Sequence, residues 1–171
     1  MAAVTFDVPF VLGMMRLHEA QEMHQASHLA DWIEARLEQG LHWFDHADIY
    51  GNGACETLFG QALRARPALA KQLNVVTKAS IANDNPAPGS GKVKHYNANP
   101  DYLGRAIDDA LGRLGVERLD HFLIHRADLL MDAAATGRAL DDAIEAGKIG
   151  AAGVSNHLPS QWRRLQRHMH Q

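Results

Sequence analysis

The chain lacks most of the features that would place it in a specialised structural class. Cys55 is the only cysteine among 171 residues, so no internal disulfide can form and a reducing compartment is expected. Aromatic residues make up only 6%, and no apolar run approaches the length that spans a bilayer. The N-terminal stretch MAAVTFDVPFVLGMM has no basic segment ahead of its apolar residues, so a signal peptide is not expected. These absences predict a soluble, cytoplasmic protein without a membrane partner.

Other partners and cofactor folds are also disfavoured. The formal net charge of −3 gives no electrostatic attraction for nucleic acid. No G-x-G-x-x-G sequence follows the first apolar run, which argues against a Rossmann fold. Eleven histidines invite a metal hypothesis, but many lie in polar segments without metal-ligand spacing, so we predict no metal site. No feature of the sequence indicates an oligomeric state.

What the sequence does contain is an alternation of short apolar runs and longer amphipathic stretches, enough for one domain over residues 1–171. Strands are predicted at residues 8–15, 42–47, 74–79, 119–124 and 149–154. Helices are predicted at residues 27–39, with Ser27 as N-cap and Gly40 as the stop, and at 55–64, 101–114, 134–146 and 159–168. Residues 83–100, rich in Asn, Pro, Gly and Lys, are expected to be irregular.

Five consecutive strand–helix units predict an α/β fold with a parallel sheet and helices outside it. Without a Rossmann motif, the remaining choice is a (β/α)₈ TIM barrel, which usually needs about 250 residues. We therefore expect an incomplete barrel of about five strand–helix units.

Ionisable side chains occur at the ends of three predicted strands. Asp45 ends the second strand, Lys78 lies within the third and His125 follows the fourth, while Tyr50 lies on the loop five positions after Asp45. The carboxyl ends of neighbouring parallel strands meet at one edge, so these four side chains are expected to converge on one pocket.

This combination suits the reduction of a carbonyl group. A carbonyl that accepts hydride builds negative charge on its oxygen and needs a proton donor there. Tyr50 can donate a proton if a neighbouring ammonium such as Lys78 stabilises its phenolate form. Asp45 would hold Lys78 charged and oriented, and His125 could bond the substrate oxygen. Each residue also has a plain structural reading, for example Asp45 as a loop cap or His125 as a core histidine, but their joint placement favours catalysis.

Four segments of the sequence resemble the aldo-keto reductase family. FDHADIYGNGACE is similar to its signature of an aspartate followed five positions later by the proton-donating tyrosine, and VVTKAS and LDHFLIHRAD are similar to its lysine- and histidine-bearing strands. GVSN resembles the segment whose serine and asparagine, here Ser155 and Asn156, hydrogen-bond the nicotinamide carboxamide. Within the family, DHADIYG, HYN and HRADLLMD look closest to a bacterial oxidoreductase subgroup.

The resemblance implies an NADPH-dependent barrel enzyme that reduces small aldehydes or ketones, with Asp45, Tyr50, Lys78 and His125 as catalytic residues. Family members continue through three more strands, which supply a glutamine, a stacking aromatic residue and the loop that grips the 2′-phosphate of NADPH. Because the sequence stops within PSQWRRLQRHMHQ, we expect a truncated chain with weak cofactor binding and poor activity.

Three alternatives to the reductase interpretation remain open from the sequence. A metal-dependent barrel hydrolase could use His42, Asp45, His46 and Asp48, although His42 and His46 share a strand face that Asp45 does not. Lys78 could instead be a Schiff-base nucleophile. The non-enzyme alternative is a catalytically silent fragment or interaction subunit, completed by another chain.

Overall fold

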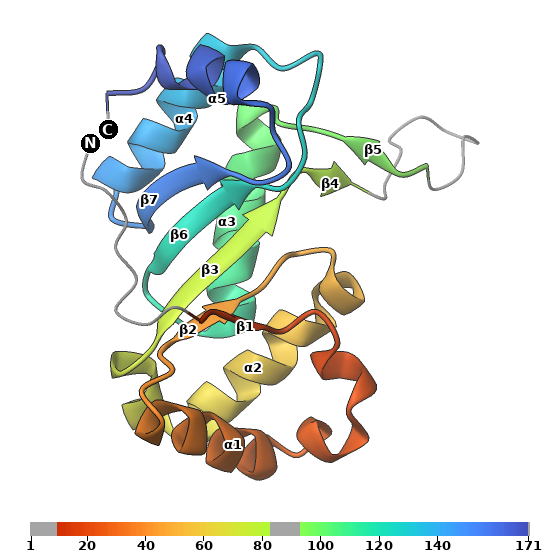
Figure 1. Ribbon diagram of the computed structural model, residues 1–171, viewed down its shortest axis with the longest axis vertical. Helices are drawn as coiled ribbons and strands as arrows, with labels where there is room; N and C mark the ends of the chain where they lie inside the picture. The colour runs from red at the N-terminus through yellow and green to blue at the C-terminus, as the bar shows by residue number, and fades with distance from the viewer. Residues whose placement is uncertain (1–9, 83–92, 171) are drawn as a thin grey trace.

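The computed structural model describes residues 10–82 and 93–170. A five-stranded sheet has the order β1-β2-β3-β6-β7, and every neighbouring pair of strands is parallel (Figure 1). Its strands are β1 (Leu12–Gly13), β2 (Trp43–Asp45), β3 (Asn74–Ala79), β6 (Leu119–Ile124) and β7 (Ile149–Val154). The spatial order follows the chain order, as it does for successive strands of a (β/α) barrel.

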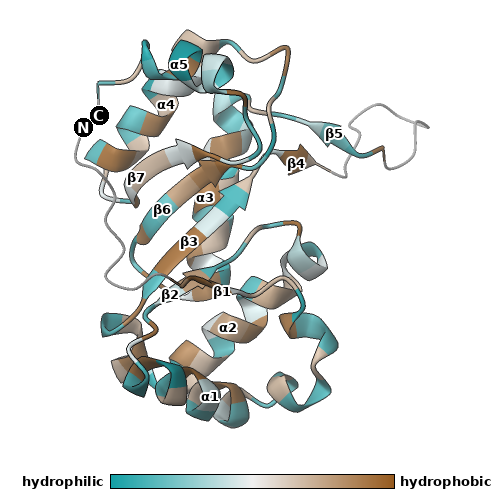
Figure 2. Ribbon diagram, in the orientation of Figure 1, coloured by the Kyte–Doolittle hydropathy of each residue, from teal (hydrophilic) through white to brown (hydrophobic). Residues whose placement is uncertain are grey.

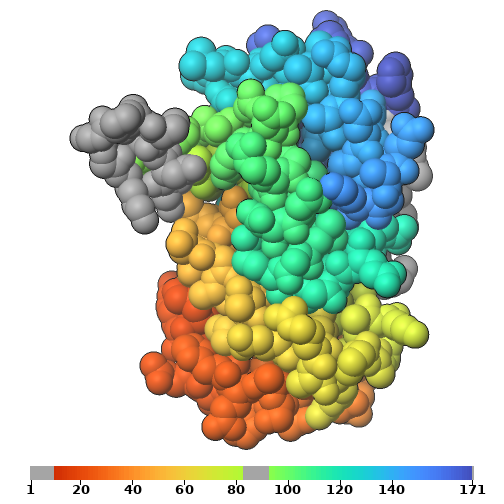
Figure 3. All heavy atoms as spheres, turned by 180° about the vertical axis from the view of Figure 1, so that it is seen from behind, coloured from red at the N-terminus to blue at the C-terminus, as the bar shows by residue number. Residues whose placement is uncertain are grey.

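Helices follow the strands and cover one face of the sheet. The α-helices are α1 (Ala26–Glu38), α2 (Ala54–Ala65), α3 (Pro100–Leu114), α4 (Ala133–Glu145) and α5 (Pro159–Gln166). Short 3₁₀ turns are η1 (Leu17–Glu19), η2 (Gln21–His24), η3 (Tyr50–Gly53) and η4 (Pro67–Lys71). In Figure 1, α3 passes behind β3 and β6, and seen from behind in Figure 3 its residues lie between the α2 and α4 regions. The expected parallel sheet with helices outside it is confirmed.

The main hydrophobic core lies between the sheet and these helices. Phe44 of β2, Phe59 of α2 and Phe122 of β6 are wholly or almost wholly buried, and the Phe44 and Phe59 ring centroids lie 5.1 Å apart. Figure 2 shows the corresponding apolar colouring on the strands and on parts of the helices. This side is called the outer face of the sheet, and the opposite side, which carries Lys78, the inner face.

Register assigns alternate residues to the two faces. Asp45 pairs with Val76, and Lys78 pairs with Leu123, so all four share the inner face. Phe44 pairs with Val75 on the outer face, where it contacts Phe59. Phe44 therefore points away from the face that Val76 and Leu123 share, because adjacent strand residues point to opposite faces.

Helix ends agree with the sequence in most places. Asn99 caps α3 by accepting a hydrogen bond from the Asp101 backbone N–H, and Gly115 beyond its last residue has a φ of 69°. Gly40 adopts a φ of 79° just past α1. The prediction that Ser27 caps α1 is wrong: the helix begins one residue earlier, and Gln25 occupies the N-cap without a side-chain bond.

A small antiparallel pair interrupts the predicted irregular segment. β4 (Ile81–Ala82) pairs with β5 (His95–Tyr96) at the carboxyl end of β3, while residues 83–92 lie outside the described ranges. Residues 8 and 9 of the predicted first strand also lie outside them, and β1 itself spans only two residues. Within the two described ranges, no helix is long and apolar enough to cross a membrane.

Candidate active site

The side chains expected to act together lie at the carboxyl edge of the sheet. Asp45 is the last residue of β2, Lys78 is the penultimate residue of β3, and His125 directly follows β6. Tyr50 opens η3, the turn after β2, and Ser155 with Asn156 follows β7. Parallel strands place all of these termini on one edge, as the sequence predicts.

The buried ammonium of Lys78 is the centre of this group. Its Nζ lies 2.6 Å from Asp45 Oδ1, donates to the His46 carbonyl at 2.7 Å and lies 3.3 Å from the Tyr50 hydroxyl. An ammonium has three N–H donors, and these three acceptors match them. A Schiff-base nucleophile would have to break this set of contacts.

A left-handed turn presents Tyr50 to Lys78. Gly51, Asn52 and Gly53 have φ values of 56°, 54° and 85° in succession, and the chain then enters α2. Two of the three are glycines, which adopt this conformation without steric cost. A Cβ at Gly51 would also lie 2.8 Å from the His18 ring. The turn thus joins the proton-donor candidate to the start of a helix through only three residues.

His125 is buried beside Tyr50. Their rings form an edge-to-face pair with centroids 6.0 Å apart. Burial, together with the positive charges of Lys78, Arg126 and Lys94, lowers the pKa of His125 to about 4. Its buried Nδ1 has no hydrogen-bond partner among the described residues. His125 is consequently a neutral imidazole at pH 7.

Ser155 and Asn156 form the last part of the edge. The Asn156 Nδ2 donates to the His125 carbonyl at 3.1 Å and to Ser155 Oγ at 2.8 Å, and Asn156 has a left-handed φ of 57°. The amide side chain therefore ties the end of β7 to the end of β6. A hydroxyl and an amide at this position have the donors and acceptors that a ligand carboxamide would need.

The residues of the metal-hydrolase alternative point in different directions. His42 Nδ1 lies 2.9 Å from the Gln72 carbonyl, His46 is wholly buried against Phe59, and Asp45 is engaged with Lys78. Over residues 10–82 and 93–170, no cluster of three or more His, Cys, Asp or Glu side chains is arranged to hold a metal ion.

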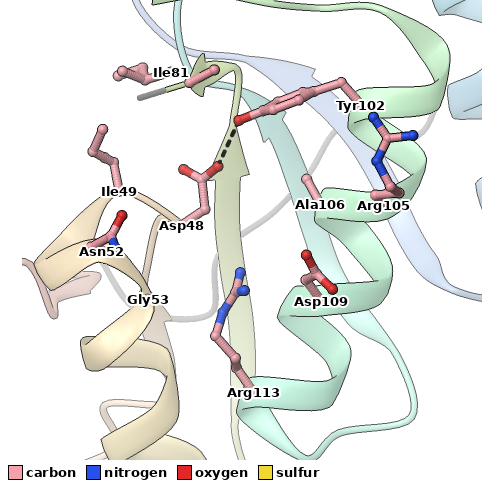
Figure 4. Close-up of a pocket in the computed structure, with 11 residues that line it drawn as sticks. Asp48, Ile49, Asn52, Gly53, Ile81, Tyr102, Arg105, Ala106, Asp109 and Arg113 are labelled. Atoms are coloured by element: carbon pink, nitrogen blue, oxygen red, sulfur yellow. Dashed lines mark hydrogen bonds between the residues drawn. The ribbon is translucent and has the colours of Figure 1, made fainter. Parts of the chain in front are cut away.

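A separate cavity of about 420 Å³ lies between the η3 turn and α3 (Figure 4). Asp48 and Tyr102 face each other across it, with the Tyr102 hydroxyl donating to Asp48 Oδ2 at 3.3 Å. Burial, and then the charge of Glu56, raises the pKa of Asp48 to about 6. None of the four candidate catalytic side chains lines this cavity.

Three residues behind the site, Glu56, Thr77 and Arg113, were not predicted from the sequence. Glu56 of α2 is wholly buried; its Oε1 accepts from the Thr77 hydroxyl at 2.6 Å, and its Oε2 pairs with Arg113 Nε at 2.7 Å. The sequence did indicate that Glu56 is buried, because it lies three positions before Phe59 and seven before Leu63, on the apolar face of the helix.

Comparisons with known proteins give the same family that the sequence motifs resemble. The profile of the Aldo/keto reductase family matches residues 9–170. A 6-dehydroglucose reductase of Agrobacterium fabrum is 38% identical over 91% of this chain and 52% of its own length, and the oxidoreductase YdhF of Escherichia coli is 37% identical over 92% and 51%. The chain therefore spans about half the length of the curated relatives it matches.

Solved structures give the same result for the fold. A glycerol dehydrogenase of Gluconobacter oxydans superposes with a TM-score of 0.75 at 27% identity, over 95% of this chain and 50% of that protein. An aldo/keto reductase of Klebsiella pneumoniae in complex with NADP and acetate gives 0.70 at 25% identity, over 92% and 48%. The fold is thus that of a (β/α)₈ barrel of the aldo-keto reductase type, of which the described residues form a five-stranded parallel part. With the profile matching nearly its whole length, the chain belongs to the aldo/keto reductase family.

Proposed function

We propose that this site reduces aldehydes or ketones to alcohols with NADPH, and that Tyr50 is the general acid. The observation that carries the proposal is the position of the Lys78 ammonium, bonded at once to the Asp45 carboxylate and the Tyr50 hydroxyl. This is the arrangement that a tyrosine needs in order to release its proton.

Each of the four candidate catalytic side chains would have a separate role in the reaction. The Tyr50 hydroxyl donates its proton to the substrate oxygen as negative charge develops there, and Lys78 stabilises the phenolate that remains. Asp45 keeps Lys78 charged and directed at Tyr50. Neutral His125, beside the Tyr50 ring, donates a hydrogen bond that orients the carbonyl oxygen.

The cofactor supplies the hydride when it is bound. Ser155 and Asn156 would hold its nicotinamide carboxamide, because a hydroxyl and an amide oxygen can bond both ends of that group. The fit is supported by the position of Asn156, whose Nδ2 reaches the His125 carbonyl at 3.1 Å and so places the amide next to the proton-transfer group. The NADP-bound relative of Klebsiella pneumoniae supports the choice of nucleotide.

The substrate class is a small molecule with an aldehyde or ketone group. The relative of Agrobacterium fabrum, a 6-dehydroglucose reductase, makes a sugar carbonyl the first compound to assay beside simple aldehydes.

The test is the loss of NADPH absorbance with an aldehyde, in the parent chain and in Tyr50→Phe. Removing the general acid is expected to lower kcat by about a hundredfold or more. Tyr102→Phe is the matched control, since Tyr102 bonds Asp48 in the separate cavity and should leave kcat near the parent value.

Two results would count against the proposal. Equal turnover by the parent and Tyr50→Phe would exclude Tyr50 as the acid. A folded parent chain that neither binds nor oxidises NADPH would instead favour the alternative of a catalytically silent fragment or interaction subunit.

A further inference from the structure

A buried carboxylate joins three elements directly behind the candidate active site. Glu56 has no exposed surface, and each of its oxygens has one partner: the Thr77 hydroxyl of β3 and Nε of Arg113 on α3. A buried charge is costly in a protein interior, and apolar residues of similar size often stabilise a fold as well or better. The presence of this charge therefore calls for a reason beyond packing.

The position of Thr77 supplies one. Thr77 points to the outer face and is 1% exposed, while its neighbour Lys78 points to the inner face. A hydrogen bond that fixes the Thr77 side chain also fixes the rotation of β3 at that residue, and with it the direction of the Lys78 side chain. The Glu56 contact thus acts on Thr77, which directly precedes the residue that bears the candidate ammonium.

Glu56 is also close to Tyr50 along the chain. Only the left-handed turn Gly51–Gly53 separates Tyr50 from α2, whose third residue is Glu56. The segment containing Tyr50 and Glu56 therefore meets β3 twice, at Tyr50–Lys78 on the inner face and at Glu56–Thr77 on the outer face.

Arg113 connects α2 to the neighbouring helix α3. Arg113 holds Glu56 Oε2, and α2 approaches α3 so closely that a Cβ on Gly60 would lie 2.0 Å from the Arg113 carbonyl. Arg113 in this way limits sliding of α2 along β3.

We propose that Glu56 is a positioning residue that, through Thr77 and Arg113, sets the distance between the Tyr50 hydroxyl and the Lys78 ammonium. The relevance to catalysis rests on the proposed function above, but the geometry can be tested without any turnover. Glu56, Thr77 and Arg113 do not take part in proton transfer themselves.

His125 provides the reporter. The Lys78 charge is one of the causes that lower its pKa to about 4, together with burial, Arg126 and Lys94. If the Lys78 ammonium moves away from the Tyr50–His125 pair, the pKa of His125 rises. It can be measured by NMR titration of the histidine rings in the cofactor-free chain, with His125→Gln identifying the signal.

The first variant is Thr77→Val, which keeps the shape of the side chain and removes the hydroxyl. We expect it to raise the pKa of His125 by about half a unit or more, while Thr77→Ser, which keeps the hydroxyl, restores the parent value. Thr136→Val is the matched control, because Thr136 is also wholly buried but donates to the Ala98 carbonyl on the α4 side.

The second variant is Glu56→Leu, which separates positioning from direct electrostatics and serves if Thr77→Val does not fold. A leucine side chain can accept neither from Thr77 nor from Arg113, so both contacts are lost. Loss of a negative charge by itself would lower the pKa of His125, whereas displacement of Lys78 raises it. We expect a rise.

An unchanged or lowered pKa of His125 in folded Thr77→Val or Glu56→Leu would overturn the inference, as would an equal rise in Thr136→Val. If the chain reduces an aldehyde, Thr77→Val should also lower kcat about tenfold with KM little changed. A rise in the pKa of His125 in a chain without reductase activity would refute the proposed function and leave the positioning geometry standing.

Discussion

At the scale of single residues, the charge state of each buried ionisable group follows from its immediate contacts. Lys78 has three acceptors for three donors, whereas His46, its neighbour on the outer face, has none for either ring nitrogen among the described residues. Lys78 can therefore remain an ammonium inside the protein, and His46 must remain neutral.

His46 makes the stability of the chain depend on pH. Burial, and then the charge of Lys78, lowers the pKa of His46 from 6.5 to about 3 in the folded chain. The unfolded chain binds this proton at a higher pH, so stability is complete above pH 6.5 and is lost as the pH falls toward 3. Replacing His46 by Leu should remove about 1.4 kcal/mol of this loss per pH unit, as urea unfolding across that range would reveal. The Lys78 bond survives, because it uses the His46 backbone carbonyl.

Asp48 provides a control of opposite sign. Its pKa is raised to about 6 by burial, so the folded chain holds a proton there that the unfolded chain releases above pH 3.8. Its favourable contribution is present at low pH and is lost as the pH rises through 6. Asp48→Asn should therefore gain stability relative to the parent as the pH rises from 4 to 7, whereas His46→Leu should gain stability as the pH falls. A gain in the same direction of pH for both variants would contradict these assignments.

The positions of Asp45, Lys78 and His125 were predictable from sequence because each lies at a strand end that its own apolar run marks. Asp45, Lys78 and His125 follow or close such runs, and parallel strands bring run ends together. The Glu56–Thr77–Arg113 contacts were not predictable, since they join residues far apart in sequence through side-chain geometry that no periodicity encodes.

At the scale of elements, the long strands and helices were predictable and the short ones were not. β3, β6 and β7 have the predicted bounds, and α2 differs by one residue at each end. β1, with two residues, depends on its pairing with β2 for its existence, and the β4–β5 pair depends on contact between segments on either side of residues 83–92. Local sequence carries little information about strands that are defined only by a partner.

The close approach of α2 and α3 gives a prediction at this scale. Gly60→Ala would place a Cβ 2.0 Å from the Arg113 carbonyl and 2.8 Å from the Leu114 backbone, both of which are helix main chain and cannot rotate away. We expect a loss of about 2 kcal/mol or more in the free energy of unfolding, measured by denaturant titration.

Gly112→Ala is the matched control on α3. A Cβ at Gly112 meets nothing within 4 Å, so the same substitution should stabilise the helix by about 0.5–1 kcal/mol. A loss in Gly112→Ala as large as that in Gly60→Ala would contradict the assignment of the effect to the contact between α2 and α3.

At the scale of the whole molecule, the sheet has two edges. Within the described ranges, β1 pairs only with β2, and β7 pairs only with β6. Strand edges and a partly apolar inner face (Val11, Leu123 and Ala151 among its residues) favour contact with other chains.

We expect the chain to self-associate as its concentration rises. Ala151→Lys would place a charge on the inner face beside the β7 edge and should shift sedimentation velocity profiles toward the monomer. Ala146→Lys, at the exposed end of α4, adds the same charge away from that face and should leave association unchanged. Monomeric behaviour of the parent at all concentrations would contradict the prediction.

The alternation of residues along β3 also has a consequence for directed evolution. Val76 and Lys78 belong to the inner face of the sheet, whereas Val75, Thr77 and Ala79 belong to the outer face, which carries the helices. A library that randomises only the inner-face positions of β2, β3 and β6, outside the four candidate catalytic residues, would sample new substrates without disturbing the scaffold. A library of equal size on the outer-face positions would yield mostly unfolded clones, although the two sets of codons lie next to each other in the gene.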